Sequence, residues 1–83
     1  MLCMKELKIY TKFDTGLYSK TPKEINAAFD FAHKNEIGIF SYFDIFGNLY
    51  IKYYSMKDVS KFVQLEDIIR NSFDKYMITE VRL

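Results

Sequence analysis

Alternating apolar and polar residues mark the first element of the chain. Over residues 7–13 the odd positions carry side chains suited to a core, namely Leu7, Ile9, Thr11 and Phe13. The even positions carry side chains that tolerate water, namely Lys8, Tyr10 and Lys12. A period of two predicts a β-strand with one buried face. Asp14-Thr15-Gly16 then predicts a turn that ends this strand.

Apolar residues at spacings of three and four predict two helices. Thr21-Pro22-Lys23-Glu24 supplies an N-cap, a first-turn proline and a reciprocal glutamate. One apolar stripe follows, made of Ile25, Ala28, Phe29 and Ala32, and Gly38 is expected to close the helix in a left-handed conformation. A second stripe predicts a helix over residues 59–76, with Ser55 or Asp58 as its cap. Its members are Val59, Phe62, Leu65, Ile69, Phe73 and Tyr76.

Residues 39–54 are rich in aromatic and branched side chains and predict a β-hairpin interrupted by Phe46-Gly47-Asn48. An odd loop centred on Gly47 gathers the aliphatic side chains on one face. Its pairs are Ile45 with Leu49, Phe43 with Ile51, and Ser41 with Tyr53. The opposite face then carries rings interleaved with charges, namely Phe40, Tyr42, Tyr50 and Tyr54 with Asp44 and Lys52.

The order of the predicted elements defines a fold class. Residues 79–83 alternate again and add a final short strand, which gives the order strand, helix, strand, strand, helix, strand. This order predicts an α+β protein with a ferredoxin-like split βαβ arrangement, in which two helices cover one face of a four-stranded antiparallel sheet. The first and third strands are expected at its centre. With 83 residues, we expect one domain over 1–83.

Composition argues against an enzyme. Twelve basic residues oppose 11 acidic ones, so the net charge is +1 and cannot by itself draw nucleic acid or anionic lipid. Cys3 and His33 are each the only residue of their type, without a glycine-rich phosphate loop or metal-ligand spacing. The adjacent acids Glu66 and Asp67 indicate a solvated surface. We expect no catalytic residues, no metal and no other cofactor.

The chain also carries signs of its origin. Lys5, Glu6 and Lys8 come too early for a signal peptide, and no apolar run approaches the ~18 residues of a membrane span. A single cysteine suits a reducing compartment. We therefore expect a cytoplasmic protein with no membrane partner. Abundant Phe, Tyr, Ile, Asn and Lys, whose codons are AT-rich, indicate a low-GC bacterium or one of its phages or mobile elements.

The predicted sheet leaves one face without a helix, and this face is the candidate binding surface. Its predicted binding residues are Tyr10, Phe40, Tyr42, Tyr50, Tyr54, Lys8, Lys12 and Lys52. Arg82 and the acidic residues Glu6, Asp44 and Glu80 are expected beside them. Contiguous exposed aromatics are unusual on monomers and tend to mark a partner site, where tyrosine gives large contact area. The alternative is ordinary solvent-side residues that cover one another through cross-strand pairs.

Part of the hairpin resembles a known family. Residues 47–53 resemble part of the RNP1 motif of RNA-recognition motif domains, with Gly47, Tyr50, Ile51 and Tyr53 at matching positions. Ile9-Tyr10 is similar to the start of the RNP2 motif. The resemblance implies that Tyr10 and Tyr50 stack on RNA bases. The chain departs from the motif where Phe46 replaces the basic lead residue, Asn48 the second aromatic and Leu49 a small residue.

Three functions are consistent with this face. The first is a non-enzymatic interaction protein that binds another protein or a nucleoprotein complex through the face or the neighbouring edge strand. Small size and AT-rich composition also fit a phage or mobile-element inhibitor of a bacterial host or defence machine. The second is a single-stranded RNA- or DNA-binding module with RNA-recognition-motif-like geometry. The third is a structural homodimer, in which a second copy covers the face.

Overall fold

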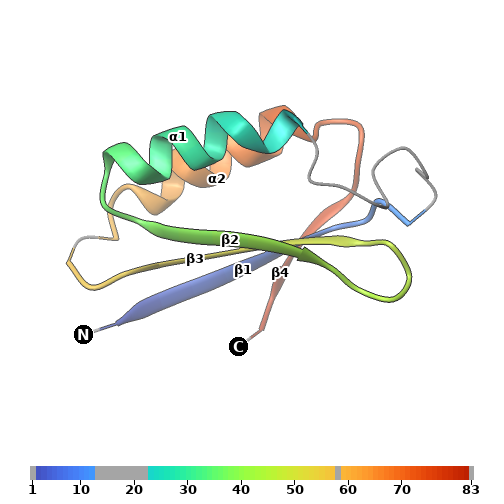
Figure 1. Ribbon diagram of the computed structural model, residues 1–83, viewed down its shortest axis with the longest axis horizontal. Helices are drawn as coiled ribbons and strands as arrows, with labels where there is room; N and C mark the ends of the chain where they lie inside the picture. Colours follow the sequence, from blue (N-terminus) through green and yellow to red (C-terminus); the bar gives the residue numbers. More distant parts are fainter. Residues whose placement is uncertain (1, 13–22, 58, 83) are drawn as a thin grey trace.

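The computed structural model describes residues 2–12, 23–57 and 59–82 and has two layers (Figure 1). Its elements are β1 (Cys3–Ile9), η1 (Lys23–Ile25), α1 (Asn26–Lys34), β2 (Gly38–Phe43), β3 (Leu49–Ser55), α2 (Phe62–Ser72) and β4 (Ile78–Val81). The four strands form one antiparallel sheet in the order β2-β3-β1-β4. The α+β class and the central position of the first and third strands are therefore confirmed.

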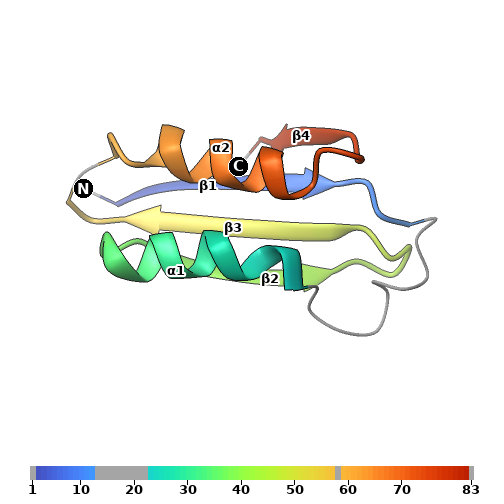
Figure 2. The same ribbon diagram turned by 90° about the horizontal axis from the view of Figure 1, so that it is seen from above.

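Both α-helices lie on the same side of the sheet. Figure 2 shows α1 and α2 running along the strands, with α1 over the β2 side and α2 over the β1 side. An amphipathic helix buries its apolar stripe against the neighbouring layer. The other face of the sheet is left without a helix in the described part of the chain, and this face holds the predicted binding residues.

A single core fills the space between the sheet and the helices. The strands contribute alternate side chains, namely Leu7, Ile9, Leu49, Ile51 and Tyr53, each with no exposed surface. The helical segments contribute Ile25, Ala28, Ala32, Phe62, Leu65 and Ile69, with Phe73 directly after α2, and all are 3% exposed or less. These are the positions that the two periodicities predicted. Each fully buried aliphatic or Phe side chain contributes about 1.5–3 kcal/mol to folding.

The hairpin keeps the predicted faces but not the predicted pairs. Phe43 pairs with Leu49 rather than with Ile51, so the register is displaced by two residues. A displacement of two leaves every side chain on the same face, because the side-chain period of a strand is also two. The prediction that Ile45 faces the core is wrong, since this residue is 84% exposed in the connecting loop.

The side chain of Asp44 explains the observed register. Its carboxylate accepts hydrogen bonds from the backbone N–H of Phe46 and of Asn48, both at 2.9 Å. The backbone N–H of Asp44 donates to the carbonyl of Asn48 at 3.0 Å, and Gly47 adopts a positive φ of 86° that glycine tolerates. Residues 44–48 therefore form a closed loop, which fixes the first strand pair directly outside it.

Helix boundaries were less predictable than helix faces. The second helix was expected over residues 59–76, but α2 has only 11 residues and begins after Lys61 without a side-chain cap. Val59 is 45% exposed, so the predicted stripe begins too early. Gly38 was expected to close the first helix, yet it begins β2, and Glu36 takes the left-handed conformation at φ 57°. Phe13, Asp14-Thr15-Gly16 and the predicted caps Thr21-Pro22 and Asp58 lie outside the described residues.

The final strand has the opposite side-chain orientation to the one predicted. Glu80 pairs with Leu7 in β1, so Glu80 lies on the helix side rather than on the bare face. Its carboxylate lies 3.9 Å from the ammonium of Lys5, which is also 3.6 Å from the carboxylate of Glu66. Glu66 in turn accepts a hydrogen bond from the hydroxyl of Tyr53 in the core. Glu66 is therefore a partly buried acceptor and not the solvated residue that we expected.

Thr11 joins the end of β1 to the hairpin loop. Its hydroxyl donates to the carbonyl of Gly47 at 2.7 Å and accepts the N–H of Leu49 at 3.1 Å. Thr11 is 1% exposed, so water cannot replace these bonds if the hydroxyl is lost. The predicted inward position of Thr11 is confirmed, and its function is to satisfy backbone groups beside the loop.

We predict that Thr11→Val lowers the free energy of unfolding by about 1–3 kcal/mol, because two buried backbone groups lose their hydrogen bond to its hydroxyl. Urea denaturation followed by circular dichroism measures this change. Thr79→Val is the matched control, because Thr79 is exposed and should cost about 0.5 kcal/mol or less. Equal midpoints for the two variants would contradict the role given to Thr11.

Candidate functional site: the bare face of the sheet

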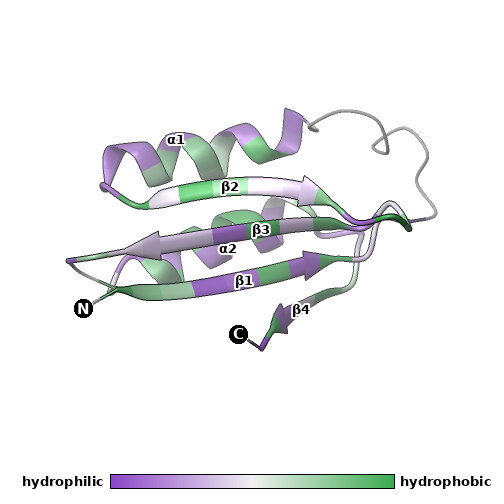
Figure 3. Ribbon diagram, turned by 60° about the horizontal axis from the view of Figure 1, so that its bottom comes forward, coloured by the Kyte–Doolittle hydropathy of each residue, from purple (hydrophilic) through white to green (hydrophobic). Residues whose placement is uncertain are grey.

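Cross-strand pairing brings most of the predicted binding residues together on the face without helices. Figure 3 shows this face of the sheet turned toward the viewer. One row across the sheet joins Tyr42, Tyr50, Lys8 and Thr79 through their strand pairs. The next row joins Phe40, Lys52, Glu6 and Val81. Rings therefore lie toward β2, and charged side chains lie toward β1. Tyr54 pairs with Gly38 beyond the second row.

Three rings form a continuous aromatic ladder, made of Phe40, Tyr42 and Tyr50. The rings of Tyr42 and Tyr50 are stacked at a centroid distance of 5.0 Å and an angle of 5°. Phe40 continues the stack at 6.3 Å from Tyr42. Phe40 and Tyr42 remain 44% and 42% exposed, although both are large apolar side chains. The outer end of the ladder is therefore open to a partner.

Two lysines lie beside the aromatic ladder, one at each end. The ammonium of Lys8 lies 4.6 Å from the centroid of the Tyr10 ring and 5.7 Å from that of Tyr50. The ammonium of Lys52 lies 5.9 Å from the Phe40 centroid. Such contacts favour the charged form of the amine. The hydrogen bond with the Tyr50 hydroxyl is the main cause that raises the pKa of Lys8.

The acidic residues of this face are already engaged inside the protein. Glu6 is only 4% exposed and accepts a hydrogen bond from the Tyr42 hydroxyl. Asp44 accepts the Tyr50 hydroxyl at 3.1 Å in addition to its loop bonds. Partial burial opposes ionisation of Asp44, but its bonds from Asn48, Phe46 and Tyr50 outweigh this and lower its pKa. Among the charged side chains in the two rows, Glu6 is therefore buried, whereas Lys8 and Lys52 are only partly buried.

The ring of Tyr54 covers Gly38 at the edge strand. A Cβ atom at Gly38 would overlap this ring, so the close approach requires glycine. Tyr54 remains 38% exposed on its outer side. The prediction that Tyr54 shares the bare face is confirmed, but its packing against Gly38 was not expected.

The remaining predicted residues lie at the margin of the face. Tyr10 is partly exposed, and its hydroxyl lies 3.3 Å from the Thr79 hydroxyl, so β4 contributes to the face. Lys12 is exposed beyond the end of β1, and its backbone N–H donates to the Asn48 side chain at 3.1 Å. Arg82 follows β4 and does not belong to it. The face thus also includes Thr79 and Val81, which were not among the predicted residues.

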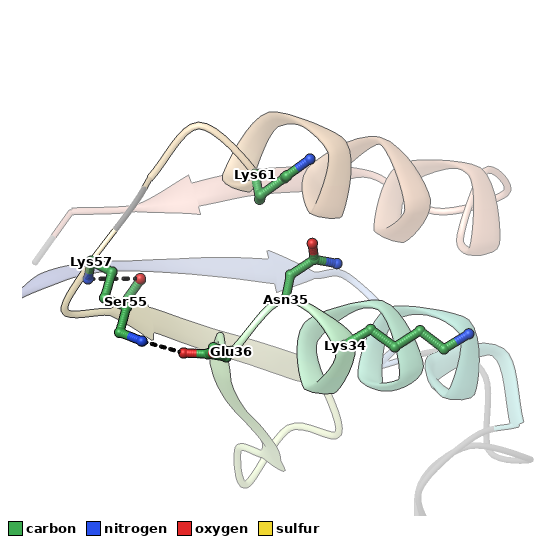
Figure 4. Close-up of a pocket in the computed structure, with 6 residues that line it drawn as sticks. All are labelled: Lys34, Asn35, Glu36, Ser55, Lys57 and Lys61. Atoms are coloured by element: carbon green, nitrogen blue, oxygen red, sulfur yellow. Dashed lines mark hydrogen bonds and ion pairs between the residues drawn. The ribbon is translucent and has the colours of Figure 1, made fainter.

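A second surface feature is a hollow of about 220 Å³ at one end of the helices (Figure 4). It is lined by Lys34, Asn35, Glu36, Ser55, Lys57 and Lys61. The Lys57 ammonium contacts the Glu36 carboxylate at 2.6 Å, which raises the pKa of the lysine and lowers that of the glutamate. Both side chains are largely exposed, and such pairs contribute little. The hollow offers surface charge and no enclosed polar cavity.

His33 and Cys3, the two residues considered for nucleophilic or metal chemistry, both pack against other side chains. His33 packs edge-on against Phe29 on α1 at a centroid distance of 6.3 Å. Cys3 begins β1 and packs partly against the core. Within residues 2–12, 23–57 and 59–82, no group of three or more His, Cys, Asp or Glu side chains could hold a metal ion.

Comparisons with known proteins give no assignment. No family model matches the chain, and no curated protein or solved structure matches it. No helix in the described part of the chain is long and apolar enough to cross a membrane. Any functional inference therefore depends on the geometry of the bare face.

We predict that Tyr42 ionises only at strongly alkaline pH. Partial burial of its hydroxyl, followed by the bond to Glu6, raises its pKa from 10.0 to about 12. The fold thus favours the neutral form, and this contribution to stability is complete below pH 10 and is lost as the pH rises to about 12. Tyrosinate absorbance of the wild type minus that of Tyr42→Phe should show this ionisation. A difference curve centred near the ordinary tyrosine value would contradict it.

Proposed function

We propose that this protein is a non-enzymatic interaction protein that binds another protein through the bare face of its sheet. The observation that supports the proposal best is the exposed aromatic ladder on β2 and β3, whose neighbouring acids are engaged internally. Rigid rings contribute large contact area while losing little side-chain entropy on binding. We also propose that the fold is a ferredoxin-like split βαβ arrangement, which the strand order supports.

The chemistry of the face favours a partner with apolar and acidic groups. Lys8 and Lys52 hold their ammonium groups over the rings, while Glu6 and Asp44 are hydrogen-bonded within the face. A partner therefore meets aromatic surface and positive charge together. Complementary negative charge speeds association and excludes wrong partners. The composition expected of a low-GC phage or mobile element suggests a bacterial host protein as the partner.

Base stacking fits the same face less well. A stacking platform needs free ring faces. Tyr50 lies against Tyr42 with a centroid distance of 5.0 Å, and Lys8 lies over both Tyr10 and Tyr50. A base would have to displace these contacts at both positions implied by the RNA-recognition-motif resemblance. We therefore rank a protein partner above single-stranded nucleic acid.

We predict that the double variant Phe40→Ala, Tyr42→Ala loses a partner that the wild type captures from a lysate of a low-GC bacterium. Truncation of these two exposed rings should cost about 2 kcal/mol or more of binding free energy, roughly 30-fold in affinity. Mass spectrometry of the captured proteins identifies the partner, and titration with that purified protein measures the loss.

The matched control is Val63→Ala on α2. Val63 is 64% exposed and lies in the helical layer, away from the bare face, so its truncation should leave capture unchanged. Circular dichroism establishes that each variant is folded. Equal capture by the wild type and the double variant would refute the proposal. Oligonucleotide binding that weakens steeply with salt would favour the nucleic-acid alternative, and a dimer that covers the rings would favour the homodimer.

A further inference from the structure

The two edges of the sheet differ in the devices that normally prevent strand addition. Edge strands are usually kept short, charged, interrupted by proline or bulged. β4 has only four residues, one of which is Glu80, and Arg82 follows it directly in sequence. β2 has six residues, with the sequence GIFSYF, and contains neither charge nor proline. Its pairing with β3 is one to one from Gly38 to Phe43, so no bulge interrupts it.

The outer edge of β2 presents a regular row of backbone groups. In an antiparallel ladder, residues alternate between those bonded to the neighbouring strand and those facing the other way. The bond from Asp44 to Asn48 sets the phase, so Phe40 and Tyr42 belong to the bonded pairs. The N–H and C=O groups of Ile39, Ser41 and Phe43 therefore point away from β3. Among the described strands, none lies beyond them.

Resting on the proposed function, we infer that β2 receives an extended segment of the partner protein as a fifth strand. At ~3.3 Å per residue, the six residues of β2 present an edge of about 20 Å. Backbone bonds to the three outward-facing residues supply affinity, and alternate side chains supply specificity. A segment of about six residues is enough to cover this edge.

The side chains around β2 define the chemistry of the added segment. On the helix side, Ile39 and Phe43 are partly buried against the core, so they favour apolar neighbours. On the bare face, the added strand meets Phe40 and Tyr42, with the Lys52 ammonium 5.9 Å from the Phe40 centroid. An acidic side chain there would pair with Lys52. The side chains of the segment should thus alternate in character. Those on the helix side should be apolar, and those on the bare face should include at least one acidic residue.

A second copy of this chain fits the edge less well than an extended segment. Figures 1 and 2 show α1 running along β2 on the helix side, and the two elements are in contact. A copy added through its own β2 would bring its α1 to the same side, and packed helices need about 8–10 Å between their axes. Neighbouring strands are separated by only about 4.8 Å. An extended segment brings no helix with it.

The experiment selects phage-displayed random peptides of about 12 residues on the immobilised wild-type protein, a length that exceeds the β2 edge. Enriched peptides are expected to alternate apolar and acidic residues. Ser41→Pro should weaken their binding by about tenfold or more, because proline removes a central outward N–H and obstructs the added strand. The β2–β3 bonds do not use this N–H, so circular dichroism should be unchanged.

The matched control is Glu80→Pro, which removes the outward N–H of the opposite edge strand and should change peptide affinity by no more than about twofold. Amide hydrogen exchange on the wild-type protein gives a second measurement that needs no variant. Peptide binding should slow exchange at Ile39, Ser41 and Phe43. No enriched peptide, equal binding to Ser41→Pro, or unchanged exchange at these amides would overturn the inference.

The outcomes also separate this inference from the proposed function. If Ser41→Pro captures the bacterial partner normally while Phe40→Ala, Tyr42→Ala does not, the bare face binds the partner and the fifth-strand inference is wrong. If edge-binding peptides are selected but the double variant captures the partner normally, the inference about β2 stands and the proposed use of the face is wrong.

Discussion

The closed loop at residues 44–48 is the constraint on which the rest of the surface depends. Asp44 holds this loop through the N–H groups of Phe46 and Asn48, and the register of β2 on β3 follows from it. That register places Tyr42 opposite Tyr50 and Phe40 opposite Lys52. The stack of Tyr42 on Tyr50 and the position of Lys52 beside Phe40 follow from this register. The lowered pKa of Asp44 keeps its carboxylate ionised across the neutral range.

On each side of the sheet, a tyrosine hydroxyl bonded to a glutamate carboxylate gives a buried polar group its hydrogen-bond partner. On the helix side, the Tyr53 hydroxyl donates to Glu66, so a ring with no exposed surface keeps a hydrogen-bond partner. On the bare face, the Tyr42 hydroxyl donates to Glu6, and here the carboxylate is the buried group. No buried side-chain nitrogen or oxygen atom in the described residues lacks a partner. On the bare face this arrangement buries the carboxylate of Glu6, while Lys8 and Lys52 are only partly buried.

Periodicity predicted which side chains face the core, but it could not fix the exact pairing. Leu7, Ile9 and Ile51 were placed correctly because a strand of period two has only two sides. A hairpin displaced by two residues has the same sides, so the pattern alone could not distinguish the observed register from the predicted one. The bonds that decide the register come from Asp44. This residue was expected on the bare face, so its role in the loop was not predicted.

Short elements were the least predictable from local pattern. In β4, Ile78, Thr79 and Val81 all suit a strand, so either set of alternate residues could face the helices. The choice depends on pairing with β1, including the bond from the Tyr10 N–H to the Met77 carbonyl at 3.0 Å. The prediction that Gly38 closes a helix was wrong for another reason. Glycine is required at this position because the ring of Tyr54 packs against it, and not because a helix ends there. Both cases require tertiary contacts that a single sequence does not display.

The two edge strands of the sheet differ in length and charge, and β2 is the more open of the two. The rings of β2 lie on the bare face, and the strand carries no charged side chain along its outer edge. Evolution commonly interrupts such a strand, because an open edge also invites association with the wrong chain. Here the charges that could protect it lie one strand inward, on Lys52, where the ammonium reaches Phe40. A cation in that position leaves the backbone accessible and selects against positively charged segments, so the same residue can restrict association and specify a partner.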